Sequence, residues 1–348
     1  MARQKTENTE YDALKAALRQ NAPENFYIFY GEEPYLRDYY LEMLRKKTVS
    51  GPAETFNFHR LGGKDLDLNA LAGALEALPM MSEHTLTVVE EYDLFRAPES
   101  ERSQLLAMLS DLPETTIVVF LYDTVAYKPD GRQKKLTALI KEKAHVVEFR
   151  KQTQRALTDW IAKHFRAAGK EISPEDAAYL VFQTGGAMTT LSSEIEKLSA
   201  YVSGNRVTRT DINMVVEPVL DAVAFQISDA IGAGDYDRAL ERLHTVLLMQ
   251  QEPVVILGAI GTQLRRLHMA KVLQEQGKST DYLVQLAGVS DYAARLAMKA
   301  ARDVPMRWCV LAVDRCAETD YRLKSSYDEP ERLLELLLVE LAEARRHG

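Results

Sequence analysis

A short apolar strand that leads directly into a glycine and a helix start constrains this chain most strongly. Residues Tyr27 to Leu36 read Tyr-Ile-Phe-Tyr-Gly-Glu-Glu-Pro-Tyr-Leu. Nucleotide-binding α/β domains often place a phosphate loop here, where backbone N–H groups, a lysine and a magnesium-binding hydroxyl hold the phosphates. This loop is too short and lacks a Gly-Lys-Ser/Thr ending, and Glu32 and Glu33 suit the positive end of the helix dipole themselves. The pattern therefore predicts an ATPase scaffold without an ATP site.

The first 150 residues alternate between strand and helix patterns. Leucines at spacings of three, four and three (Leu68, Leu71, Leu75 and Leu78) mark one of the helices. Strands separated by helices predict a parallel sheet that is covered on both faces. The expected strands are Phe26–Tyr30, Thr55–Leu61, Thr85–Val89, Thr116–Leu121 and Val146–Phe149.

The rest of the chain is expected to be helical, with no strand after Phe149. Ser173 and Pro174 mark a helix start, because serine caps helices and proline suits the first turn. The last helix is expected at Pro330–Arg346, and Pro218 marks a boundary. The sequence thus predicts three domains: an α/β domain (1-150), a small helical domain (151-218) and a larger helical domain (219-348).

Composition limits the classes of function. The chain has no run of 18 uncharged apolar residues, and its first 21 residues are charged and polar, so neither a membrane span nor a signal peptide is expected. Cys309 and Cys316 are interpreted as buried thiols, which fits a reducing cytoplasm. The net charge is −8, whereas a protein that binds DNA alone is usually basic. The chain therefore either avoids nucleic acid or meets it within a larger assembly.

No catalytic motif stands out. Neither Gly-x-Ser-x-Gly nor His-Glu-x-x-His occurs, and the seven histidines are scattered singly. Arg265 and Arg266 are interpreted as part of a polar helix face rather than as a nucleic-acid patch. We therefore expect no catalytic residue, no metal site and no cofactor.

One junction is less ordinary. Leu78-Pro79-Met80-Met81-Ser82 joins the leucine-rich helix to the strand that begins at Thr85. Two large apolar side chains at a surface connection are typical of a recognition surface, because methionine adapts to irregular grooves. The residues alone leave two interpretations open: a recognition surface, or two methionines packed in the core of the first domain.

The order of residues resembles the delta subunit family of the bacterial DNA polymerase III clamp loader over essentially the whole chain. No single stretch is diagnostic, but their order across the three domains is specific. The resemblance implies an AAA+-like architecture: a RecA-type α/β domain that lacks a P-loop, a small helical lid, and a helical collar for oligomerisation. The matching stretches are Tyr27–Leu36, Ala77–Val89, Leu191–Leu198 with Tyr201, Val207–Val215, Gln263–Leu267 and Leu323-Lys324-Ser325.

The resemblance also implies a function in DNA replication. Delta subunits bind the ring-shaped sliding beta clamp and open it, without ATP hydrolysis of their own. ATPase subunits (tau/gamma) and delta-prime complete a hetero-pentamer that loads the clamp on primed DNA. The family's clamp contact is a hydrophobic pair, often aromatic or leucine, that matches Met80 and Met81. The flanking clamp-binding residues are then Leu78, Pro79 and Ser82.

A further position comes from the same resemblance. An aromatic residue of the family that can lie against the primer–template end matches Tyr327, and an ordinary interfacial tyrosine is the alternative. Two other functions stay open. One is a divergent ATPase of AAA+ fold with another role in DNA metabolism, which would have to bind phosphate at Gly31. The other is a stand-alone nucleic-acid binder, against which the net charge argues.

Overall fold

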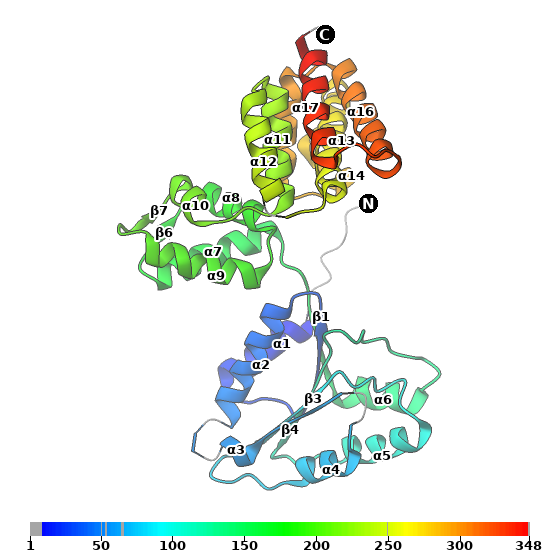
Figure 1. The fold of residues 1–348 in the computed structure, drawn as a ribbon. Helices are drawn as coiled ribbons and strands as arrows, with labels where there is room; N and C mark the ends of the chain where they lie inside the picture. Colours follow the sequence, from blue (N-terminus) through cyan, green and yellow to red (C-terminus); the bar gives the residue numbers. More distant parts are fainter. Residues whose placement is uncertain (1–8, 50, 53, 64–65, 249, 347–348) are drawn as a thin grey trace. The chain divides into compact units, whose positions relative to one another are not determined.

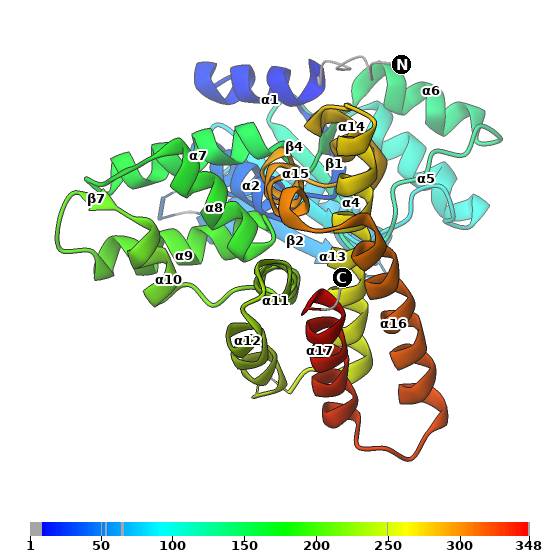
Figure 2. The same cartoon turned by 90° about the horizontal axis from the view of Figure 1, so that it is seen from above.

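The computed structural model describes residues 9–49, 51–52, 54–63, 66–248 and 250–346 of the 348-residue chain. The chain divides into two compact units, Met1–Gln152 and Thr153–Gly348. Figures 1 and 2 show the elements of each unit from two directions. The first unit is α/β and the second is almost entirely helical.

The first unit contains a five-stranded parallel sheet with the strand order β2-β3-β4-β1-β5. Helices α1 and α2 cover one face, and α4, α5 and α6 cover the other (Figure 1). The strands are β1 (Phe26–Gly31), β2 (Phe58–Gly62), β3 (Thr85–Glu90), β4 (Thr116–Leu121) and β5 (His145–Phe149). The helices are α1 (Thr9–Gln20), α2 (Pro34–Thr48), α3 (Glu54–Asn57), α4 (Leu68–Glu76), α5 (Glu99–Ser110) and α6 (Lys134–Lys143).

Strand β1 is buried on both faces, as expected of a central parallel strand. Successive side chains point to opposite faces of the sheet. Phe26 and Ile28 belong to the core beneath α4, α5 and α6. On the other face the ring of Phe29 meets Phe149, with 5.1 Å between ring centroids.

Two boundaries in the first unit differ from the sequence prediction by more than one residue. Residues Thr55 to Asn57 belong to helix α3, so the expected strand Thr55–Leu61 begins only at Phe58. The leucine-rich helix ends at Glu76 instead of continuing to Leu78. The cap residue Ala77 already has an extended backbone. Leu78 precedes Pro79, and a residue before proline disfavours helical backbone angles.

The second unit begins with a small helical part. It contains α7 (Gln154–Ala167), α8 (Pro174–Thr184), α9 (Met188–Tyr201) and α10 (Arg209–Val215). Ser173 caps α8 as predicted, because its Oγ accepts a hydrogen bond from the backbone N–H of Asp176. The expectation that no strand follows Phe149 is wrong. Two parallel strands, β6 (Glu171–Ile172) and β7 (Arg206–Val207), pair here, and two residues are too short for a strand periodicity to be recognised.

Most of the remaining helices pack against α13, which lies beside α16 (Figure 2). They are α11 (Leu220–Ala233), α12 (Tyr236–Leu248), α13 (Pro253–Glu275), α14 (Thr280–Ala287), α15 (Asp291–Ala300), the 3-10 helix η1 (Ala301–Asp303), α16 (Met306–Ser325) and α17 (Pro330–Arg346). Cys309 and Cys316 are buried free thiols, as predicted. Of the helices in the described part of the chain, none has the length and apolar character that a membrane crossing requires.

The division into three domains stays a prediction. The boundary at 150 lies close to the division between the two compact units, at Gln152. The segments 151-218 and 219-348 lie almost wholly within the second unit.

Candidate functional site

The connection between α4 and β3 presents apolar side chains to solvent. Leu78 is 82% exposed, Met80 51% and Met81 90%. The interpretation in which both methionines pack in the core is therefore wrong. We call residues 78–82 the methionine loop. A contiguous set of exposed apolar side chains is characteristic of an interaction site.

A buried asparagine holds the backbone of the methionine loop. Asn57, the last residue of α3, is 1% exposed. Its Nδ2 donates to the carbonyl oxygen of Met80 at 2.7 Å, and its Oδ1 accepts from the backbone N–H of Met80 at 2.8 Å. One amide thus satisfies both main-chain polar groups of Met80, and the side chain of Met80 takes no part.

Ser82 provides a second anchor two residues on. Its Oγ donates to the carbonyl oxygen of Thr48, the last residue of α2, at 2.7 Å. Between the two anchors Met81 has a φ of +53°, in the left-handed region that costs an ordinary residue about 1 kcal/mol or more. The two anchors impose this conformation, and Met81 is the most exposed residue of the loop.

The methionine loop lies at the amino-terminal edge of the sheet. It leads into β3, while Asn57 directly precedes the neighbouring strand β2, and these two strands are parallel. Residues that precede parallel strands share one edge, and residues that follow them share the opposite edge. The carboxyl edge, where open α/β sheets bind ligands, is therefore a separate place.

At the carboxyl edge, Gly31 is required by a close approach of two strands. Its φ is +133°, and a Cβ at this position would lie 2.3 Å from the carbonyl oxygen of Phe149. The backbone N–H of Glu33 donates to that same oxygen at 3.0 Å. Glu33 itself is buried, and burial raises the pKa of its carboxyl group. The turn that suggested a phosphate loop is thus bound to β5.

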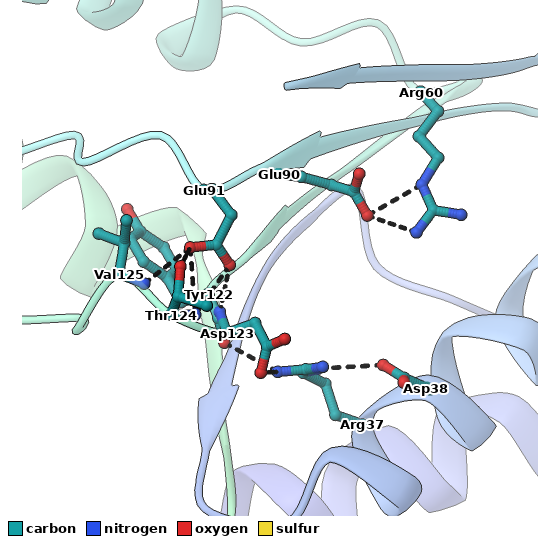
Figure 3. A network of polar contacts seen from close by, with 9 residues as sticks. All are labelled: Arg37, Asp38, Arg60, Glu90, Glu91, Tyr122, Asp123, Thr124 and Val125. Atoms are coloured by element: carbon teal, nitrogen blue, oxygen red, sulfur yellow. Dashed lines mark hydrogen bonds and ion pairs between the residues drawn. The ribbon is translucent and has the colours of Figure 1, made fainter. Parts of the chain in front are cut away.

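A buried arginine occupies the neighbouring space (Figure 3). Arg37 is 4% exposed and donates to the carbonyl oxygen of Tyr122 at 3.2 Å and to the carboxylate of Asp123 at 2.8 Å. Burial acts to lower the pKa of Arg37, but Asp123 and Asp38 raise it overall. Arg60 and Glu90 form another ion pair at this edge.

The carboxylate of Glu91 lies in a cradle of hydrogen-bond donors (Figure 3). It accepts from the backbone N–H groups of Asp123 at 2.6 Å and Val125 at 2.7 Å, and from the hydroxyl of Thr124 at 2.7 Å. Burial opposes ionisation, but these bonds hold the pKa of Glu91 below its ordinary value. Successive backbone N–H groups are a common anion site, and here the chain's own carboxylate fills it.

Sequence comparison identifies the family. The family described as "DNA polymerase III, delta subunit" matches residues 27–150, and "DNA polymerase III delta subunit, C-terminal domain" matches residues 221–341. The chain belongs to the DNA polymerase III delta subunit family. Membership of this family gives the chain a clamp-loader role in DNA replication.

Individual relatives agree with the family. The chain is 25% identical over 338 residues to "DNA polymerase III subunit delta" of Bacillus subtilis (strain 168), which covers 95% of this chain and 96% of the relative. A "Probable DNA polymerase III subunit delta" of Aquifex aeolicus (strain VF5) is 22% identical, with 84% of each chain covered.

A solved structure supports the fold. "Bacillus subtilis DNA clamp loader delta protein (YqeN)" has a TM-score of 0.58 and 24% identity, with 96% of this chain and 99% of that chain covered. The predicted fold class, a parallel α/β domain followed by helices, is confirmed.

Tyr327, the other position that the delta family suggested, is fully exposed in the connection between α16 and α17. It lies in the second unit and the methionine loop in the first. In the described part of the chain, no three His, Cys, Asp or Glu side chains form a group that could hold a metal ion.

Sequence reasoning did not find the residues that hold the loop and the carboxyl edge. Asn57 lay inside an expected strand, and a polar amide between Phe56 and Phe58 was the one available signal. Arg37 and Glu91 gave none, since their partners lie far along the sequence or are backbone groups.

Proposed function

We propose that this chain is the delta subunit that binds the sliding beta clamp and opens it during clamp loading, through Leu78, Pro79, Met80, Met81 and Ser82. The observation that carries the proposal is the pair of exposed methionines on a loop fixed at Asn57 and Ser82. Membership of the delta family supports it.

Two properties of the loop favour binding: its apolar side chains and its fixed conformation. Apolar anchors at the centre of an interface typically cost about 2 kcal/mol or more each when truncated. A loop already held in one conformation loses less entropy on binding, so more of the contact energy appears as affinity. The chain opens the ring by binding its open form more tightly than its closed form, which shifts the equilibrium between the two.

This subunit hydrolyses no ATP in our proposal, and it contributes no catalysis of its own to the polymerase assembly. The turn at Gly31 is hydrogen-bonded to β5 through the backbone N–H of Glu33, and the carboxylate of Glu91 fills the anion cradle at the carboxyl edge. A steady-state assay of ATP hydrolysis by the chain tests this point. Magnesium-dependent hydrolysis would favour the divergent ATPase instead.

The partners follow from the same proposal. The helices of 219-348 join tau/gamma ATPase subunits and delta-prime in a hetero-pentamer in the cytoplasm. The exposed ring of Tyr327 contacts primed DNA by stacking on a base. Because the net charge of this chain is −8, its partners supply the positive field for DNA.

The decisive experiment changes both methionines. Met80→Ala with Met81→Ala should abolish pull-down of the sliding clamp while assembly with the other loader subunits stays intact. The matched control is Met214→Ala, since Met214 is 70% exposed but lies in the second unit. Undiminished clamp binding by the double variant would show that the contact lies elsewhere.

A further inference from the structure

The second unit contains a cavity of about 410 Å³ that the clamp contact does not use. Helices α8 and α10 of the small helical part form one wall, and α11, α12 and α15 form the other. Its volume falls within the roughly 300–1,000 Å³ of small-molecule sites.

Arginines outnumber carboxylates among the residues that line the cavity, although the protein as a whole is acidic. Arg209, Arg238 and Arg242 line it, and Asp229 is the only carboxylate among its lining residues, all of which lie in the described part of the chain. Arg209 lies 3.6 Å from each of two carboxylates, those of Glu175 and Asp176. A concentration of guanidinium groups in a chain of net charge −8 indicates an anionic ligand.

Two of these arginines lack ionic partners. Within the described residues, neither Arg238 nor Arg242 forms an ion pair. The Nε of Arg242 is also buried there without a hydrogen-bond acceptor. A buried donor without an acceptor is costly, and a bound ligand is one way in which proteins satisfy it.

Aromatic rings form the rest of the wall. Phe182 contacts Phe225 and Tyr292, with 5.5 and 5.6 Å between ring centroids. The guanidinium of Arg209 lies over the ring of Tyr179 at 4.3 Å. Burial raises the pKa of Tyr179 overall, while Arg209, Arg242 and Arg238 act to lower it, so all three cations lie within electrostatic reach of one ring.

We propose that this cavity binds a nucleoside phosphate, either a free nucleotide or the phosphorylated end of a nucleic-acid strand. Guanidinium groups bind phosphate oxygens in pairs, and aromatic faces stack on bases. The amide of Gln226, which also lines the cavity, offers a donor and an acceptor to the edge of a base. The volume suits one nucleotide rather than a folded segment of a partner protein.

Calorimetric titration of the full chain with AMP, GMP, adenosine and inorganic phosphate tests the proposal. A nucleoside monophosphate should bind at least tenfold more tightly than phosphate or nucleoside alone. Arg238→Gln with Arg242→Gln should weaken this binding at least tenfold, and Arg238→Glu, a change at an exposed side chain, should also weaken it. Arg332→Gln is the matched control, since Arg332 is an exposed arginine on α17.

Three results would overturn the proposal: no binding by the unaltered chain at millimolar nucleotide, equal affinity for phosphate and nucleotide, or equal affinity in the arginine variants and the control. A 5′-phosphorylated oligonucleotide and its 5′-hydroxyl twin distinguish the two sources. Competition by the phosphorylated strand alone supports a strand end, and failure of both strands to compete supports a free nucleotide. The test is independent of Met80 and Met81, so it can fail while the clamp contact stands.

Discussion

Replacement of Asn57 by alanine should release the backbone of the methionine loop while its apolar side chains stay unchanged. The change removes two hydrogen bonds to the backbone of Met80, each worth about 0.5–1.5 kcal/mol, and leaves Met80 and Met81 in place. If the loop then samples many conformations, the free energy of clamp binding becomes less favourable by about 1–3 kcal/mol, the sum for the two bonds. A tenfold change in affinity corresponds to about 1.4 kcal/mol, so the Kd should rise by roughly 5- to 150-fold.

The assay measures Kd on an immobilised clamp together with hydrogen exchange at the Met80 amide. This N–H donates to Asn57, so it should exchange slowly in the unaltered protein and faster in the variant. Urea unfolding monitors the stability of the whole unit, and Asn69→Ala on the exposed side of α4 is the control. A Kd within twofold of the original, combined with fast exchange at Met80, would refute the claim that the fixed loop contributes to affinity.

Three further predictions concern the frame around the loop. Gly31→Ala should lower the free energy of unfolding by about 3 kcal/mol or more, or prevent folding, because the new Cβ overlaps the carbonyl of Phe149. Urea titration measures this free energy, and a loss below about 1 kcal/mol would contradict the prediction. The pKa of Glu91 is held below its ordinary value of 4.5, so its contribution to stability is present above that pH and is lost as pH falls through the lower folded value. In Glu91→Gln, the free energy of unfolding should therefore fall less steeply between about pH 5 and pH 3, roughly the range in which a paired carboxylate titrates. An unchanged slope of this free energy against pH would count against the cradle. Burial raises the pKa of Cys309 and Cys316 to about 11, so a thiol reagent at pH 8 should label them only after denaturant is added, and rapid labelling of the folded chain would disprove this.

The elements that the sequence predicted well are those whose signal is local. Strand β4 has the predicted bounds because Thr116–Leu121 is an uninterrupted β-branched and apolar run. Helix α17 also has its predicted bounds, since Pro330 suits a first helical position and leucines follow at core spacings. Helix α3 was missed because the bonds that hold Asn57 go to Met80, 23 residues further on.

The candidate site was only half predictable for a similar reason. Two methionines after a leucine stripe fit a core and a surface equally well, and only the burial of each side chain decides between them. The arrangement at the carboxyl edge depends on contacts such as Arg37 with Asp123, which lie 86 residues apart. No periodicity in the sequence encodes such a contact.

Both anchors of the methionine loop act on main-chain atoms. Asn57 contacts the N–H and the carbonyl of Met80, and Ser82 contacts the carbonyl of Thr48. Mutation at positions 80 and 81 can therefore exchange one apolar side chain for another while the loop keeps its path, with unbranched side chains at position 81 because its positive φ disfavours β-branched ones. In the proposed clamp contact, selection can follow a drifting partner surface through these two positions alone, and the same two positions are the ones to vary in redirecting the subunit to another partner.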